Sequence, residues 1–242
     1  MLLAIDIGNT RIKAAVFEAN TLLELFVFSN EELLQKSTCI LQQYPNITSI
    51  VVASVGKTEK NDLKSLENKA QIHFITHESK FPFQNLYTTP ATLGIDRMVL
   101  ATGATLQFPN QNRLIIDIGT CITYDFVNES NQYLGGAITP GIRLRYEALN
   151  HFTEKLPLLS KSIPDNFIGN STSQSIHSGV INGTLYEIEG FIKEYKTQYA
   201  KFIIILTGGD SDFLAKRLKN TIFAHSNFLL ESLNQTFQYN QK

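Results

Sequence analysis

The sequence predicts a mixed α/β fold made of two similar halves, and three observations lead to that prediction. Residues 2–17 (LLAIDIGNTRIKAAVF) contain two apolar runs on either side of a Gly-Asn turn, which is typical of a β-hairpin. Residues 114–127 (LIIDIGTCITYDFV) repeat this pattern, with Asp117 in the place of Asp6. Strand-like and helix-like patterns also alternate along the chain, which indicates layers of helices on sheets.

The first half continues with further strands and helices after its hairpin. The pattern at residues 30–44 predicts a helix, with Asn30 able to cap it and two glutamates in its first turn. A polar surface helix is expected at 57–69. Residues 81–90 contain two prolines and read as irregular, and residues 98–108 can be helical. Strands are predicted at residues 21–29, 49–53 and 72–75.

Residues 108–113 (FPNQNR) interrupt two apolar segments and form the best boundary, giving an N-terminal half of 1–110 and a C-terminal half of 111–242. The longest helical pattern, at 172–199, contains Gly179 and Gly183 one turn apart, so we expect a close neighbour there, from this chain or a second subunit. The other predicted strands are 114–117, 122–127, 133–138, 202–206 and about 221–224, and the other helices are 142–152 and 227 to about 237.

Composition excludes several classes of protein. The chain has 242 residues with 43% hydrophobic and 18% charged, enough to bury a sizeable core. A net charge of −1 argues against nucleic-acid binding. The two cysteines favour a reducing compartment over a disulfide framework. The first apolar run reaches the charged Asp6 within a few residues, which is too short for a secretory signal. No apolar run approaches the ~20 residues that span a bilayer. We therefore expect a soluble cytoplasmic protein without a membrane partner.

The first hairpin carries groups that suit a phosphate and its metal. Asp6 closes a buried strand, which is costly unless the carboxylate faces a cation or several donors. Gly8 allows close backbone approach, Asn9 and Thr10 offer donors, and Lys13 offers positive charge. On this stretch alone, an ordinary hairpin with Asp and Asn as turn formers remains an alternative.

Two further segments have both a functional and an ordinary interpretation. In Gly94-Ile95-Asp96-Arg97, the carboxylate can point into a cleft with Arg97 fixing a ligand, or it can cap a helix beside a surface ion pair. Gly208 and Gly209 follow a buried strand, as in a ligand-facing turn or a plain one. The chain contains neither a Gly-Lys-Ser/Thr P-loop nor a Gly-x-Gly-x-x-Gly motif, so Walker and Rossmann nucleotide sites are disfavoured.

Together these motifs resemble the actin and sugar-kinase ATPase superfamily, and within it the type III pantothenate kinases. The resemblance extends from about residue 2 to residue 209. The chain departs from the family pattern in two places. The family has Asn followed directly by Thr, whereas here Ser171 stands between Asn170 and Thr172. The family commonly has Ala or Thr after the threonine of the second Asp-x-Gly-Thr, whereas here Cys121 follows Thr120. The segments that carry the resemblance are DIGNT (6–10), Tyr87 with GIDR (94–97), DIGT (117–120), GGAITPG (135–141) and Leu156-Pro157.

The resemblance implies duplicated actin-like (ribonuclease H-like) ATPase domains with a cleft between them. It implies ATP-dependent phosphorylation of pantothenate to 4'-phosphopantothenate, the first step of coenzyme A biosynthesis, by a homodimer that needs Mg²⁺ and a monovalent cation, K⁺ or NH₄⁺. Asp96 would be the catalytic carboxylate and Asp117 the ligand of the monovalent metal. The ATP-binding residues would be Asp6, Gly8, Asn9, Thr10, Lys13 and Thr120, and pantothenate would contact Tyr87, Gly94, Ile95, Asp96, Arg97 and Thr172.

Three alternatives remain open from the sequence. One is another small-molecule kinase of the same superfamily, acting on a sugar. Another is a nucleotide-binding regulator that kept the fold and lost catalysis, since fold alone does not settle function. The third, a polyphosphate or nucleotide phosphatase, is less favoured, because no residue clearly positions a water. A non-catalytic relative would be free to lose Asp96, which this chain has.

Overall fold

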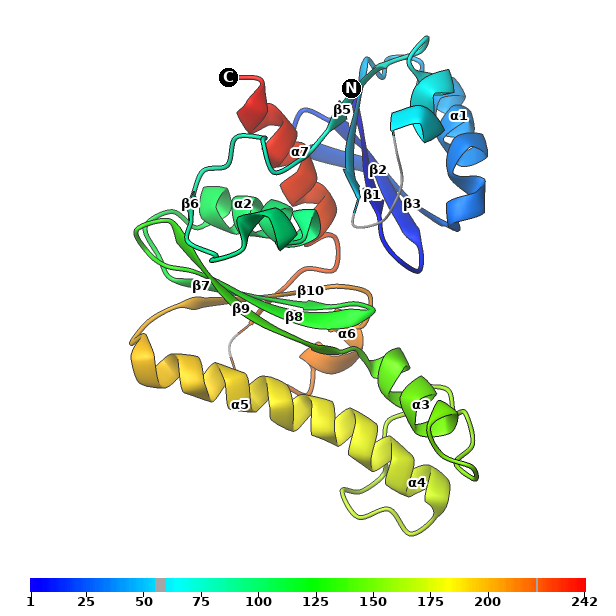
Figure 1. Ribbon diagram of the computed structural model, residues 1–242, viewed down its shortest axis with the longest axis vertical. Helices are drawn as coiled ribbons and strands as arrows, with labels where there is room; N and C mark the ends of the chain where they lie inside the picture. Colours follow the sequence, from blue (N-terminus) through cyan, green and yellow to red (C-terminus); the bar gives the residue numbers. More distant parts are fainter. Residues whose placement is uncertain (55–59, 221) are drawn as a thin grey trace. The chain divides into compact units, whose positions relative to one another are not determined.

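The computed structural model describes residues 1–54, 60–220 and 222–242, and the chain divides into two compact units (Figure 1). Unit 1 comprises Met1–Asn110, Val127–Gly135 and Asn227–Lys242, and unit 2 comprises Gln111–Phe126 and Gly136–Ser226. A compact unit need not coincide with a unit of duplication. The division into halves at residues 110 and 111 therefore stays a prediction.

Unit 1 is built on a five-stranded sheet in the order β3-β2-β1-β4-β5. The predicted hairpin is formed by β1 (Leu2–Ile7) and β2 (Ile12–Glu18), which pair antiparallel. Strand β3 (Thr21–Phe28) extends it, while β4 (Ser49–Ser54) and β5 (Gln71–Phe74) add parallel strands on the other side. Every residue of β1 is buried, because this central strand is covered on both faces.

Helices cover both faces of this sheet. On one face, α1 (Leu33–Gln43) and a 3₁₀ helix (Lys60–Leu66) pack against alternate residues of β1, β2 and β4. On the other face, α2 (Ile95–Gln107) and α7 (Phe228–Asn240) pack on each other and on β4. The two helices cross closely, since a Cβ on Gly103 would lie 1.9 Å from Ser232 Oγ. The C-terminal helix is thereby part of unit 1.

A short segment of unit 1 lies between β5 and α2. It contains β6 (Gln84–Asn85), which pairs in parallel with the first residues of β9 (Gln132–Pro140), and a 3₁₀ helix (Pro90–Thr92). The sequence predicted this segment as irregular and missed β6. A two-residue strand is too short to leave a periodic signal.

Unit 2 repeats the strand arrangement of unit 1. Strands β7 (Arg113–Ile118), β8 (Cys121–Val127) and β9 are neighbours, and β10 (Ile203–Thr207) and β11 (Phe223–Ala224) lie parallel beyond β7. The order β9-β8-β7-β10-β11 matches β3-β2-β1-β4-β5 strand for strand. This repeated topology is the structural counterpart of the repeated Asp-Ile-Gly hairpin.

The helices of unit 2 are α3 (Ile142–His151), α4 (Thr172–His177), α5 (Gly183–Gln198) and α6 (Ser211–Ala215). Helix α5 lies along one face of the sheet (Figure 1) and contributes Leu185, Ile188 and Ile192 to the core beneath β8. A π-helix, Ser178–Asn182, joins α4 to α5, so the predicted single helix over 172–199 is interrupted.

Three sequence-based expectations need correction or restriction. The helix expected at Asn30 begins with a 3₁₀ turn (Asn30–Glu32), and the capping residue is Ser29, whose backbone N–H donates to Glu32 Oε2 at 2.9 Å. Part of the helix expected at 57–69 lies outside the described residues. Finally, α2 begins at Ile95, three residues before the predicted start.

No helix among the described residues is both long and apolar enough to cross a lipid bilayer.

Candidate active site

The hairpin between β1 and β2 places a buried carboxylate beside a lysine. Asp6 is 8% exposed and pairs in register with Lys13 on β2 and with Ala53 on β4. Because residues opposite each other in antiparallel strands share a face, Asp6 and Lys13 are on the same side of the sheet. Alternate residues of β1 pack toward α1, so this is the face that α2 and α7 cover.

The turn that follows Asp6 is open to solvent. Asn9 and Thr10 are exposed and Gly8 is half-buried. A Cβ on Gly8 would lie 3.1 Å from the carbonyl oxygen of Arg11, so the turn is tight. An exposed turn with backbone and side-chain donors can bind an oxyanion without first having to open.

The first turn of α2 carries the second predicted group. Gly94 is the capping residue, so Asp96 lies inside the first turn and does not cap the helix. Asp96 Oδ1 accepts a hydrogen bond from the backbone N–H of Arg97 at 2.9 Å, and a Cβ on Gly94 would lie 2.3 Å from the same oxygen. Only a residue without a Cβ at position 94 leaves room for the Asp96 carboxylate.

Arg97 and Tyr87 are brought together beside this carboxylate. The Arg97 side chain is 5% exposed, so the interpretation of a surface ion pair does not hold. Its Cζ lies 5.8 Å from the centre of the Tyr87 ring, within the range of a cation–π contact. The Tyr87 ring also packs close to Gly135, where a Cβ would lie 3.2 Å from Cδ2. Tyr87, Gly94, Ile95, Asp96 and Arg97 thus form one cluster in unit 1.

In unit 2, Asp117 is the second-last residue of β7, the position that Asp6 has in β1. It pairs in register with Thr207 on the parallel strand β10. A Cβ on Gly208 would lie 2.3 Å from Asp117 Oδ1, and Gly208 has φ +98°, a conformation that favours glycine. The Thr207 hydroxyl is buried and has no hydrogen-bond partner among the described residues. The Thr207 hydroxyl oxygen on β10, with lone pairs available, therefore lies on the strand next to the one that carries the Asp117 carboxylate.

The residues just before α3 pack against the turn that follows Asp117 and hydrogen-bond to it. Gly141 donates its N–H to the carbonyl of Thr120 at 3.0 Å. A Cβ on Gly141 would lie 2.3 Å from Gly119 O and 2.5 Å from Thr120 O. The glycine of the Thr139-Pro140-Gly141 motif is therefore required by a close backbone approach.

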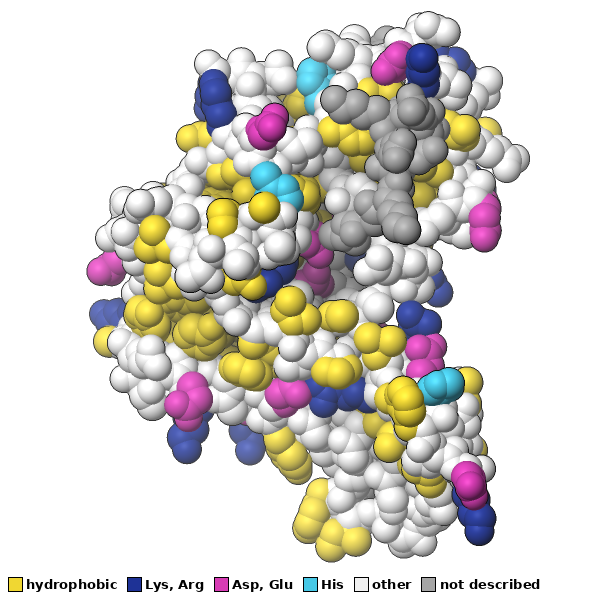
Figure 2. Space-filling view, in the orientation of Figure 1, with side chains coloured by type: hydrophobic (Ala, Val, Ile, Leu, Met, Phe, Trp, Pro, Cys, Tyr) yellow, Lys and Arg dark blue, Asp and Glu magenta, His cyan; other side chains and the backbone are white. Residues whose placement is uncertain are grey.

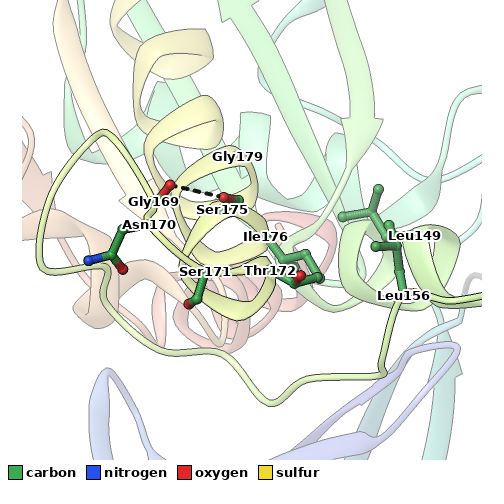
Figure 3. A pocket seen from close by; sticks show the side chains of 9 residues that line it. All are labelled: Leu149, Leu156, Gly169, Asn170, Ser171, Thr172, Ser175, Ile176 and Gly179. Atoms are coloured by element: carbon green, nitrogen blue, oxygen red, sulfur yellow. Dashed lines mark hydrogen bonds between the residues drawn. The ribbon is translucent and has the colours of Figure 1, made fainter.

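Thr172 lines a different part of unit 2, a pocket of about 640 Å³ (Figure 3). Ser171 caps α4 by accepting from the N–H of Gln174 at 3.3 Å, which gives the departure from the family pattern at this position a structural role. The lining residues are Leu149, Leu156, Gly169, Asn170, Ser171, Thr172, Ser175, Ile176 and Gly179.

The structure therefore groups the predicted residues into four sets, two in each unit. Unit 1 contains the Asp6 hairpin and the Tyr87–Arg97 cluster, and unit 2 contains the Asp117 turn and, separately, the Thr172 pocket. Thr207, Asn170 and Ser175 were missed as site residues. The signal for Thr207 was present in the sequence, since it precedes the Gly-Gly turn, whereas the two pocket residues belong to a loop and a short helix without a distinctive pattern.

Comparisons with known proteins identify the family of the chain. A family model described as type III pantothenate kinase matches residues 2–194. A protein of Flavobacterium johnsoniae named type III pantothenate kinase is 63% identical over 239 residues, covering 99% of this chain and 98% of that protein.

Solved structures extend the likeness to the fold. A Campylobacter jejuni protein provisionally described as a Baf family transcriptional activator has a TM-score of 0.67 at 23% identity, covering 99% of this chain and 98% of that one. A Listeria monocytogenes protein provisionally described as an N-acetylmannosamine kinase has a TM-score of 0.57 at 13% identity, covering 100% and 99%. The predicted duplicated actin-like fold is thus confirmed, and the chain belongs to the type III pantothenate kinase family.

Proposed function

We propose that this chain transfers the γ-phosphate of ATP to the primary hydroxyl of pantothenate and so forms 4'-phosphopantothenate, the first step of coenzyme A biosynthesis, in the cytoplasm. The observation that carries the proposal is the cluster at the start of α2. There a carboxylate, a buried guanidinium and a tyrosine ring converge in a chain of this family.

Asp96 is assigned the role of orienting the hydroxyl of pantothenate and accepting its proton. A carboxylate within hydrogen-bond reach of the alcohol can do both, and such general-base help typically contributes ~10²–10⁴-fold to the rate. Arg97 and Tyr87 stand beside it and would fix the carboxylate and the polar groups of pantothenate. Thr172 would contact pantothenate from the pocket of unit 2.

The Asp6 hairpin is assigned to the phosphates of ATP. The donors of Asn9 and Thr10 and the charge of Lys13 would stabilise the transferred group, since phosphoryl transfer depends mainly on positioning and charge. Thr120 would add a contact in unit 2. Gly8 keeps the turn tight.

The residues also fit the expected divalent ion. Among the described residues no group of three or more His, Cys, Asp or Glu side chains could hold a metal by itself. Mg²⁺ usually binds through one or two carboxylates together with substrate phosphates and waters, so a single buried Asp6 is a suitable protein ligand. When bound, the ion neutralises charge on the phosphates.

A monovalent cation, K⁺ or NH₄⁺, is assigned to Asp117. The Thr207 hydroxyl, buried without a partner in the described part of the chain, and the space that a Cβ on Gly208 would fill both suit an oxygen-lined cation site. Hard oxygen donors with one formal negative charge match K⁺ better than nitrogen or sulfur donors.

A homodimer is the last part of the proposal. Unit 2 exposes large apolar side chains before α4, visible at the lower end of the view in Figure 2. Cβ atoms on Gly179 and Gly183 would meet nothing within 4 Å, so the described part of the chain does not supply the close neighbour expected there. A second copy of the chain would cover both the exposed apolar side chains and the two glycines. The apolar residues are Phe152 (82% exposed), Leu158 (60%), Phe167 (68%) and Ile168 (67%).

A coupled ATPase assay of the purified chain tests the function, and light scattering after gel filtration tests the dimer. ATP turnover should depend on pantothenate, on Mg²⁺ and on K⁺, and hexoses should not replace pantothenate. Turnover that responds to a hexose would favour a sugar kinase, and nucleotide binding without turnover on any substrate would favour a regulator.

A further inference from the structure

Glu187, on α5, accepts hydrogen bonds from three other elements of unit 2. Its Oε1 accepts from the Tyr124 hydroxyl of β8 at 3.0 Å and from the Thr139 hydroxyl of β9 at 2.7 Å. Its Oε2 accepts from Arg145 Nη2 of α3 at 2.7 Å. The side chains of Arg145 and Glu187 are only 20% and 24% exposed, so solvent screens this ion pair less than a surface pair.

Arg145 also hydrogen-bonds to the backbone segment that packs against the turn after Asp117. Its Nε donates to the carbonyl of Pro140 at 2.8 Å. The next residue, Gly141, donates to Thr120 O and packs against the carbonyls of Gly119 and Thr120. Hydrogen bonds, with the Pro140–Gly141 peptide bond between them, therefore connect Glu187 to the turn that follows Asp117.

The π-helix explains how a glutamate comes to lie at this place. In an uninterrupted α-helix, position 187 would fall eleven residues and about three turns after Ile176, on the same face, and its carboxylate would enter the core. The π-helix (Ser178–Asn182) inserts one residue, so Ile188 takes the core position and is 0% exposed. Glu187 is thereby turned to the edge of the core, where Tyr124 and Arg145 meet it.

We propose that Glu187 and Arg145 are positioning residues that fix the turn Gly119–Thr120, and through it Asp117 and Thr120. This inference rests on the proposed function, which gives these two groups to the monovalent cation and to ATP. Neither Glu187 nor Arg145 contacts a substrate in this account. They act through Pro140 and Gly141.

The kinetic test compares Glu187→Gln with Glu147→Gln. Glu147 is a matched control, because it pairs with Arg143 at 2.8 Å on the exposed side of α3. Groups that orient a ligand of a metal typically change affinity or activity ~10–100-fold when altered. We therefore expect Glu187→Gln to raise the half-activating K⁺ concentration and the KM for ATP by about tenfold or more, with the KM for pantothenate within about twofold. Glu147→Gln should match the wild type.

A conservative variant keeps the test decisive if Glu187→Gln folds poorly. Arg145→Lys retains the charge but loses the rigid fork that reaches Pro140 O through Nε and Glu187 through Nη2, so it should show the same split between the KM values. A general loss of kcat with all KM values unchanged, in both variants, would overturn the positioning role.

Hydrogen exchange supplies a readout that does not depend on activity. In either variant, peptides that contain the Gly141 amide should exchange faster than in wild type, while peptides of β10 should exchange as before. Unchanged exchange at Gly141 would refute the inference. If the wild type shows no pantothenate-dependent turnover at all, the proposed function fails instead, and the exchange data still decide whether Glu187 holds the turn.

Discussion

Gly208 and Gly209 are neighbours in one turn, yet the structure predicts a large loss of stability when Gly208 is replaced by alanine and almost none when Gly209 is. Gly208 has φ +98° and is buried, and a Cβ there would lie 2.5 Å from the carbonyl oxygen of Ile118 and 2.3 Å from Asp117 Oδ1. Gly209 is exposed, and a Cβ there would meet nothing within 4 Å among the described residues.

The expected cost of Gly208→Ala has two parts. A left-handed backbone conformation costs a residue with a Cβ ~1–2 kcal/mol. The contact with the Ile118 carbonyl cannot be relieved by a side-chain rotation, and overpacking of this kind costs ~1–3 kcal/mol. A total of ~3 kcal/mol lowers the Tm of a chain of this length by roughly 6–12 °C. Gly209→Ala should leave the Tm within about 2 °C.

Gly208→Ala should also change function in a specific way. The new methyl group would push the Asp117 carboxylate from its place, so activation by K⁺ should weaken beyond what the lower Tm explains. Thermal unfolding of both variants, followed by rates against K⁺ at 20 °C and constant ionic strength, measures the two effects. Equal Tm values for the two variants would refute the reasoning, as would an unchanged K⁺ response in Gly208→Ala.

Three further substitutions test individual roles. Asp96→Asn should keep the Tm, because an amide oxygen can still accept from the Arg97 N–H, while kcat falls ~10²–10⁴-fold; a kcat within threefold of wild type would reduce Asp96 to a structural residue. Asp6→Ala should abolish Mg²⁺-dependent turnover, and retained activity with the same Mg²⁺ dependence would move the phosphate site elsewhere. Asp117→Asn should fold and should need more K⁺ or no longer respond to it in steady-state assays, whereas a wild type indifferent to K⁺ would contradict the assignment.

Much of the fold could be predicted because its signals are local. The two Asp-Ile-Gly hairpins gave the duplicated topology, since a repeated turn between apolar runs specifies the first two strands of each sheet. Boundaries were less certain. The sequence placed the cap of the first helix at Asn30, one residue late, because Ser29 and Asn30 are both good capping residues and only the bond to Glu32 distinguishes them.

What the sequence could not give depends on contacts between distant residues. Helix α7 belongs to unit 1, and its Asn234 donates to the carbonyl of Ala19 at 2.9 Å, a contact that no local pattern encodes. The π-helix (Ser178–Asn182) is a second such feature, because the sequence predicted one uninterrupted helix over 172–199. The cluster of Tyr87 with Arg97 was predicted as part of one site, and the roles of its residues stay predictions.

Identification of the phosphorylated product tests the central claim most directly. The purified chain would be incubated with ATP, Mg²⁺, K⁺ and an equimolar mixture of pantothenate and hexoses, and the products separated and identified by mass and by ³¹P NMR. We predict a single new phosphate monoester, 4'-phosphopantothenate, formed by the wild type and nearly absent with Asp96→Asn. A hexose phosphate as the product, or equal amounts of phosphopantothenate from the two proteins, would contradict the account.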